Sequence, residues 1–123
     1  MPILEVEVVV QEGEALDDDL ASWLAESAGQ VLSAPPGGTW VRLRTLPADQ
    51  YGESGGGPPP GVRPVFVRVL QARPTKDELV DDEVQRLSQT IGELCNRPAR
   101  NVHILYDPPA AGRIAFGGRV DRE

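Results

Sequence analysis

The spacing of apolar residues changes along the chain, and the two spacings that alternate predict strands and helices in turn. Residues 3–10 and 64–70 are short apolar runs rich in β-branched side chains, which is typical of strands. Residues 39–45 alternate between apolar and polar positions, and residues 101–106 form another short run. Both are therefore predicted strands as well.

Two stretches between these runs carry apolar residues at helical spacing. The first, residues 16–33, has an acidic start at Asp17–Asp19, where the positive end of a helix dipole favours negative charge. The second begins near Thr75 and Glu78, which fit a capping box for the first free amides of a helix, and it ends at Pro98. The expected apolar face of the second helix consists of Leu79, Val84, Leu87, Ile91 and Leu94.

The predicted elements form the same β-α-β pattern twice. The first unit covers residues 1–51 and the second covers residues 62–123, and a linker rich in Gly and Pro, residues 52–61, joins them. Pro2 and Pro64 open strands at matching places of the two units. The chain of 123 residues is therefore interpreted as a single domain that arose by tandem duplication.

The repeat predicts an α+β fold. Each unit is expected to hold its two strands parallel through a right-handed crossover. Two such units side by side form a four-stranded sheet with both helices on one face. Apolar residues occupy both sides of the strands, so the other face needs cover, and we expect self-association to supply it. The tail, residues 113–120, is expected to form a hairpin or an edge strand.

Composition restricts the kinds of site that the chain can hold. A net charge of −7 argues against a nucleic-acid surface, which needs a basic stripe. No apolar stretch approaches the ~20 residues of a membrane helix, and no secretory signal is visible, so a cytoplasmic protein without a membrane contact is expected. Cys95 is the single cysteine and His103 the single histidine. An internal disulfide and the usual metal clusters are therefore excluded, and neither a metal nor a cofactor is expected.

Three features together resemble the tautomerase superfamily. They are the start Met1-Pro2-Ile3 leading straight into a strand, the pair of β-α-β units, and the closing segment 101–118. That segment looks like its counterpart in the 4-oxalocrotonate tautomerase and macrophage migration inhibitory factor groups. The resemblance covers nearly the whole chain except the linker. It implies the fused, two-unit type, a homotrimer built around a barrel, which acts on small carboxylic acids without a cofactor.

The resemblance implies that Pro2 is a general base. Removal of Met1 would expose a secondary amine at the start of the first strand. An apolar pocket with cations nearby disfavours the ammonium form, so the pKa of this amine falls towards neutrality, where a general base works best. Pro64 has a peptide-bonded nitrogen and cannot take this role.

Substrate-binding residues are also implied by the resemblance. Arg73 falls near one place, and Arg42 at another, where family members carry arginines that bind a substrate carboxylate bidentately. His103 is the counterpart of Arg42 in the second unit and of a pocket tyrosine in the migration inhibitory factor group. Gln71 stands where the dehalogenase branch carries a second arginine, and Phe116 where the family supplies apolar pocket wall.

Each of these positions also has an interpretation that needs no substrate. Arg73 would be a charge in a loop, and Arg42 would belong to the solvated face of a strand. His103 would be a core or interface histidine, and Phe116 a packing residue.

Three functions stay open on the sequence alone. The favoured one is tautomerisation of a small 2-oxo or enol carboxylic acid. The second is decarboxylation, hydration or dehalogenation of a three-carbon acid; Phe116 replaces the glutamate that activates water in that branch, which counts against hydration. The third is a non-catalytic, ferredoxin-like trimeric binding module, because fold does not decide function.

Overall fold

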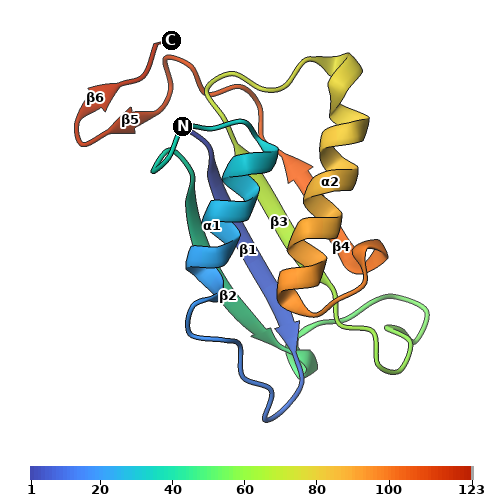
Figure 1. The fold of residues 1–123 in the computed structure, drawn as a ribbon. Helices are drawn as coiled ribbons and strands as arrows, with labels where there is room; N and C mark the ends of the chain where they lie inside the picture. Colours follow the sequence, from blue (N-terminus) through green and yellow to red (C-terminus); the bar gives the residue numbers. More distant parts are fainter. Residues whose placement is uncertain (123) are drawn as a thin grey trace.

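Two β-α-β units share one sheet in a computed structural model that describes residues 1–122 (Figure 1). The main elements are β1 (Ile3–Val10), α1 (Leu20–Val31), β2 (Trp40–Pro47), β3 (Val65–Leu70), α2 (Asp77–Cys95) and β4 (Val102–Tyr106). The sheet has the order β2-β1-β3-β4. Strands β1 and β2 are parallel, as are β3 and β4, whereas β1 and β3 are antiparallel. The predicted α+β fold is confirmed.

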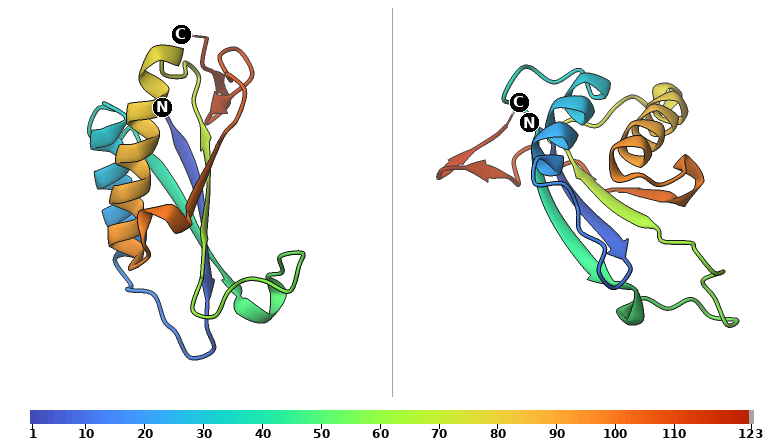
Figure 2. Two further views of the ribbon diagram at one scale, coloured as in Figure 1. Left: turned by 90° about the vertical axis from the view of Figure 1, so that its right-hand side faces the viewer. Right: turned by 60° about the horizontal axis from the view of Figure 1, so that its bottom comes forward.

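The smaller elements lie at the ends of this framework. They are the 3-10 turns η1 (Ala48–Gln50) and η2 (Ala99–Asn101) and the strands β5 (Ala115–Phe116) and β6 (Arg119–Val120). Strands β5 and β6 form the hairpin expected for the tail, and positive φ at both Gly117 and Gly118 suits its tight turn. Residues 52–61 form a loop that projects from the sheet, as does the β5–β6 hairpin (Figures 1 and 2).

The hydrophobic core lies between the sheet and the two helices (Figure 2). Alternate residues of β1 and β3 face the helices, as the period of a strand requires. The core side chains are Leu4, Val6 and Val8 from β1, Val65, Val67 and Val69 from β3, Leu20, Leu24 and Ala28 from α1, and Leu87, Ile91 and Cys95 from α2. Burial also raises the pKa of the Cys95 thiol to about 11, against the opposing charge of Arg97.

Both helices begin later than the sequence predicts. Helix α1 begins at Leu20 because the Asp17 carboxylate accepts a hydrogen bond from the Asp19 amide, 2.9 Å away, and holds these residues in a turn. The capping box expected at α2 is wrong. The Thr75 hydroxyl donates to the buried Glu83 carboxylate, and Lys76 precedes the helix without a side-chain cap.

The apolar face of α2 is also displaced from the predicted one. Leu79 is 54% exposed, whereas the buried side of the helix runs through Glu83, Leu87, Ile91 and Cys95. These positions are four residues apart and so lie on one face. The carboxylate of Glu83 therefore faces the core, whereas Leu79, which the sequence pattern assigns to the apolar face, is exposed.

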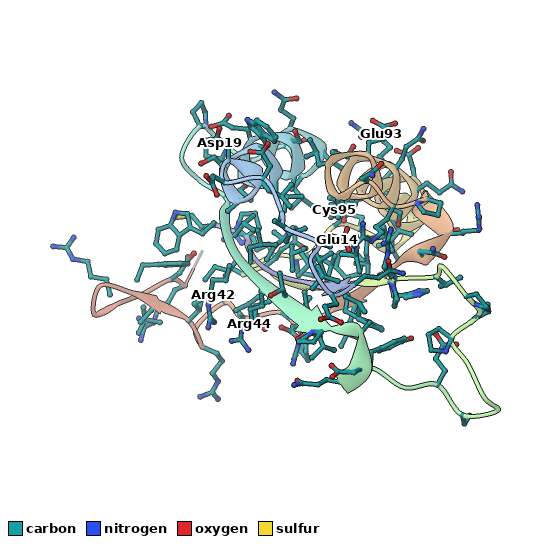
Figure 3. The ribbon with its side chains drawn as sticks, turned by 90° about the horizontal axis from the view of Figure 1, so that it is seen from below. Glu14, Asp19, Arg42, Arg44, Glu93 and Cys95 are labelled. Atoms are coloured by element: carbon teal, nitrogen blue, oxygen red, sulfur yellow. The ribbon has the colours of Figure 1, made fainter. Side chains whose placement is uncertain are left out.

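The sheet face away from the helices carries both charged and apolar side chains. Arg42 and Arg44 lie on this face (Figure 3), and Arg42 Nη1 is 2.8 Å from Glu5 Oε1. Phe66 and Leu105 also belong to it by register, and Leu105 is 59% exposed. The expectation of apolar residues on both sides of the sheet therefore holds only in part, because ion pairs interrupt the apolar surface of this open face.

The side chain of Arg97 bonds to three segments that are distant in the sequence. The residue is 5% exposed, and its guanidinium donates hydrogen bonds to the carbonyl oxygens of Val9, Arg63 and Cys95 at 2.9, 3.0 and 3.1 Å. Arg97 Nη1 also lies 3.0 Å from Glu14 Oε2. One buried cation thus joins the end of β1, the start of β3 and the end of α2.

The ion pair with Arg97 makes stability depend on pH. Burial tends to raise the pKa of Glu14, but hydrogen bonds from the Gln11 amide and Arg97, with the charges of Arg97 and Arg63, outweigh it and lower this pKa. Glu14 contributes fully to the free energy of unfolding above pH about 4.3, the pKa of a glutamate in an unfolded chain. This contribution is lost as the pH falls through the lower pKa of the folded state. We expect Glu14→Gln to be less sensitive to acid than the wild type in urea unfolding between about pH 6 and pH 3.

A matched control for this pH dependence is Glu12→Gln, which removes an exposed carboxylate close by. That variant should keep the wild-type slope of unfolding free energy against pH. A Glu14→Gln slope equal to that of the wild type would show that Glu14 has the same pKa in the folded and unfolded states.

Within residues 1–122, both helices are too short or too polar to cross a membrane.

Candidate functional site

The topology of the sheet brings Pro2 beside the segment that follows β3. Strands β1 and β3 are antiparallel, and Ile3 pairs with Leu70, so the residue before β1 lies next to the residue after β3. These neighbours are Pro2 and Gln71. Helix α1 crosses back over a parallel strand pair, so its last turn reaches the same end of the sheet. The N-terminus, the end of α1 and the end of β3 therefore meet (Figure 1).

A pocket of about 290 Å³ opens at this meeting point. Its polar wall consists of Ser33, Gln71, Arg73 and Asp121, and Pro2 lies among apolar residues of the segments 32–35 and 71–73. An apolar wall with a few converging polar groups is the usual character of a small-molecule site. Three of the residues predicted for the site, Pro2, Gln71 and Arg73, therefore line one pocket, which is called the Pro2 pocket below.

Pro2 is held firmly in this wall. Its ring is buried, and its carbonyl oxygen accepts a hydrogen bond from the Trp40 amide at 3.1 Å. Met1 also lines the pocket and is bonded to the Pro2 nitrogen. In this form the nitrogen is an amide and has no basic lone pair. Removal of Met1 would place a secondary amine at the pocket surface.

Arg73 and Gln71 supply the unpaired polar groups of the pocket. Within residues 1–122, the guanidinium of Arg73 makes no ion pair or hydrogen bond with another side chain, so its donors are open to an anion. Gln71 Oε1 is buried without a hydrogen-bond partner among the described residues. A buried polar atom left unpaired favours a ligand or a water molecule beside it.

The other predicted residues lie outside the Pro2 pocket. Arg42 is on the open sheet face, where it pairs with Glu5. His103 is exposed on β4, with its ring centroid 5.5 Å from that of Phe66. Phe116 sits in the hairpin with its ring 5.2 Å from that of Trp40. A substrate contact by Arg42, His103 or Phe116 thus stays a prediction, and within one chain the Pro2 pocket includes none of the three.

Two polar residues of the pocket are absent from the sequence prediction. Ser33 follows α1 with φ 56°, a left-handed conformation in which glycine is the usual residue. Asp121 follows the hairpin, and its amide donates to the Ile114 carbonyl at 2.8 Å, which brings the end of the chain back to the pocket. Neither residue carries a sequence signal, because only the closed hairpin and the path of the chain after α1 place them there.

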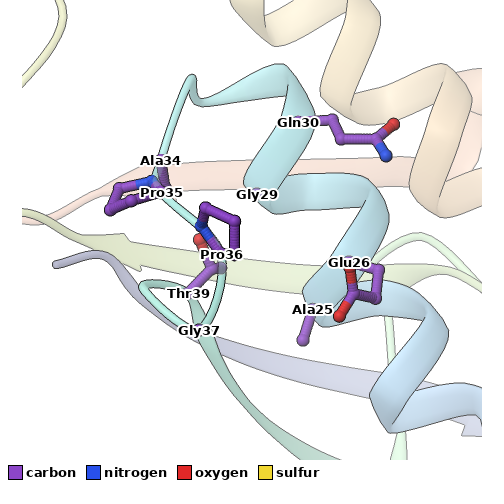
Figure 4. A pocket seen from close by; sticks show the side chains of 9 residues that line it. All are labelled: Ala25, Glu26, Gly29, Gln30, Ala34, Pro35, Pro36, Gly37 and Thr39. Carbon is purple, nitrogen blue, oxygen red and sulfur yellow. The ribbon is translucent and has the colours of Figure 1, made fainter.

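A second pocket, of about 180 Å³, lies on the outer side of α1 against residues 34–39 (Figure 4). Its wall includes Glu26 and Thr39, and none of the predicted site residues. Thr39 Oγ1, like Gln71 Oε1, is buried and has no hydrogen-bond partner among the described residues. Of these two pockets, it is the Pro2 pocket that predicted site residues line.

No family model and no curated protein matches the sequence. Solved structures do match over nearly the whole chain. A native fused 4-OT is 25% identical, with 96% of both chains covered and a TM-score of 0.69. A wild-type fused 4-OT in a symmetric trimer is 14% identical, covering 98% of this chain and 95% of its own, with a TM-score of 0.76. The macrophage migration inhibitory factor from Trichinella spiralis is 14% identical, covering 96% of this chain and 98% of its own, with a TM-score of 0.71. This chain shares their fold.

Proposed function

We propose that this chain, which has the fold of the tautomerase superfamily, is a cofactor-independent tautomerase of a small 2-oxo or enol carboxylic acid. Pro2 is the general base once Met1 has been removed. The observation that carries the proposal is that Pro2 and an unpaired arginine, Arg73, line the same pocket. A base and an anchor for a carboxylate are the two parts that proton transfer next to a carbonyl requires.

The pocket suits the steps of the reaction. Its apolar wall and the charge of Arg73 disfavour a protonated Pro2, whereas the Asp121 carboxylate in the same pocket favours one. The proposed base requires the first two effects to outweigh the third near neutral pH. Arg73 binds the substrate carboxylate through two parallel N–H donors. Pro2 takes a proton from the enol oxygen or from the carbon beside the carbonyl and returns it at the alternative position. Gln71 lines the same pocket, and in this proposal its side-chain N–H group donates to the oxygen on which charge develops.

We also propose that the protein works as a homotrimer. One of the structural neighbours is described as a symmetric trimer. The open sheet face supports self-association, because Leu105 and Trp40 remain 59% and 46% exposed in one chain. In such an assembly Arg42, His103 and Phe116 contribute to a pocket of a neighbouring copy.

The test is an ultraviolet assay with phenylenolpyruvate and 2-hydroxymuconate, together with the mass of the purified chain. A chain without Met1 is expected to tautomerise at least one of them, and a chain with an extension that keeps the Pro2 nitrogen acylated is expected to be inactive. Equal rates for the two forms would contradict the proposal. Absence of activity in a correctly processed chain would favour the non-catalytic binding module.

A second candidate is favoured by Asp121. The sequence lacks the expected water-activating glutamate, but the structure supplies a carboxylate in the Pro2 pocket at this residue. A carboxylate beside the base is suited to hydration or decarboxylation of a three-carbon 3-oxo acid. Release of carbon dioxide from such an acid, with loss of that activity in Asp121→Asn but not of phenylenolpyruvate turnover, would identify this reaction.

Arg73→Ala is expected to raise the KM for phenylenolpyruvate about 10- to 100-fold, because a charge-assisted hydrogen bond contributes about 1.5–3 kcal/mol. The KM of Arg73→Lys should fall between those of the wild type and Arg73→Ala, since lysine keeps the charge without the planar pair of donors. Lys76→Ala removes an exposed cation close by and should leave KM unchanged. Steady-state kinetics of the three variants measure this, and equal KM values for Arg73→Ala and Lys76→Ala would remove Arg73 from substrate binding.

A further inference from the structure

A buried carboxylate, Glu83, lies near the Pro2 pocket, in the wall of a neighbouring pocket that also includes Lys76 and Arg86. Glu83 is 7% exposed on α2. Its Oε1 accepts a hydrogen bond from the Thr75 hydroxyl, and its Oε2 accepts one from the Tyr106 hydroxyl at 2.6 Å. Among the described residues no arginine, lysine or histidine forms an ion pair with it. Burial and the bond to Glu83 both raise the pKa of Tyr106, so this phenol stays a donor.

Stability alone does not account for a carboxylate at this position. Glu83 shares the buried face of α2 with Leu87, Ile91 and Cys95, where an apolar residue would fit the core. Burying a carboxylate is costly, and apolar replacements of buried ionic groups are often neutral or stabilising. Thr75 is also diverted from capping α2. The carboxylate instead joins α2 to Thr75 and to Tyr106 of β4 through its two hydroxyl bonds.

The segment that Glu83 holds is the one that carries the polar groups of the pocket. The Gln71 carbonyl accepts from the Ala110 amide at 3.0 Å, which fixes the start of residues 71–75. The Thr75 hydroxyl bonded to Glu83 fixes its end. Between these anchors Arg73 makes no hydrogen bond to another residue in the described part of the chain. The Ala72 carbonyl also accepts from the Ala111 amide at 3.2 Å, so these bonds hold the backbone on both sides of Arg73.

We propose that Glu83 is a positioning residue for the Pro2 pocket, which holds residues 71–75 through Thr75 so that Arg73 and Gln71 face the substrate. The inference rests on the proposed function for its kinetic consequence. Its structural consequence, an ordered segment 71–75, does not depend on the reaction. A displacement of about 1 Å at such a group is enough to weaken catalysis strongly.

Two isosteric substitutions separate positioning from general stability. Thr75→Val and Tyr106→Phe each remove one hydroxyl from the same carboxylate. Thr75→Val is expected to raise the KM for phenylenolpyruvate about tenfold with kcat changed less than about threefold, because only the anchor of Arg73 is lost. Thr75→Val and Tyr106→Phe should lower the unfolding midpoint to a similar extent. Tyr106→Phe should change the KM less than about twofold. Thr75→Ser, which keeps the hydroxyl, should restore the wild-type KM.

A second measurement keeps the inference testable without activity. Backbone amide order parameters of residues 71–75 should fall in Thr75→Val and remain at wild-type values in Tyr106→Phe and Thr75→Ser. Unchanged order parameters in Thr75→Val would overturn the positioning role, whatever the wild-type activity. Equal increases of KM in Thr75→Val and Tyr106→Phe would also overturn it, since both would then act through stability. A processed chain with no Pro2-dependent activity but with the expected loss of order would overturn the proposed function alone.

Discussion

Pro2→Ala is expected to lower kcat/KM for phenylenolpyruvate about 10²-fold or more, since a positioned general base contributes about 10²- to 10⁴-fold. Loss of the ring gives an amine that rotates freely, whereas the proline ring points the lone pair of the nitrogen in one direction. The primary amine of the variant is also more easily hydrated, which favours its charged and inactive form. Most of the loss should appear in kcat, because Arg73 still binds the carboxylate.

Pro64→Ala is the matched control for this substitution. Pro64 opens β3 as Pro2 opens β1, and its carbonyl accepts from the Val9 amide at 3.0 Å, a bond that alanine also makes. Its nitrogen lies in a peptide bond, so kcat/KM should stay within about twofold of the wild type while stability falls slightly. Mass spectrometry must first show that Met1 has been removed from all three proteins. Equal kcat/KM values for Pro2→Ala and the wild type would exclude Pro2 as the base.

The sheet was predictable because its strands have a strong local signal. Val6, Val8, Val65 and Val67 are β-branched residues at alternate positions, and they all face the core. The duplicated pattern then decides the topology, because each unit needs a right-handed crossover and the two units must share a sheet. Helix starts were less predictable, since side chains such as Asp17 bond their own backbone and delay the helix.

The candidate site was predictable only where it follows from the resemblance. Pro2, Gln71 and Arg73 were singled out by position, but their common pocket depends on the antiparallel register of β1 with β3, which joins two different units. Ser33 and Asp121 gave no signal, because the path of the chain alone brings them to the pocket. Glu83 was missed for a different reason: a helical pattern assigns carboxylates to the solvated face.

Arg97→Met is expected to lower the free energy of unfolding by about 3–5 kcal/mol, the usual cost of breaking a buried charge network by removing one partner. Methionine fills much of the same volume, so the loss is electrostatic and not a cavity effect. It leaves the carbonyls of Val9 and Cys95 and the carboxylate of Glu14 without the guanidinium that now bonds them. With an m-value near 2 kcal/mol/M, the urea midpoint should fall by about 2 M.

Arg100→Met controls for the loss of a positive charge in the same region. Arg100 is exposed on η2, so its substitution should change the unfolding free energy by less than about 0.5 kcal/mol. The Arg97 substitution should also reduce the acid sensitivity assigned to Glu14, because the pKa of that carboxyl is lowered by the Gln11 amide and then by Arg97, and the Gln11 amide remains in the variant. A loss below about 1 kcal/mol in Arg97→Met would mean that water replaces the guanidinium, so that β1, β3 and α2 are joined by the apolar core alone.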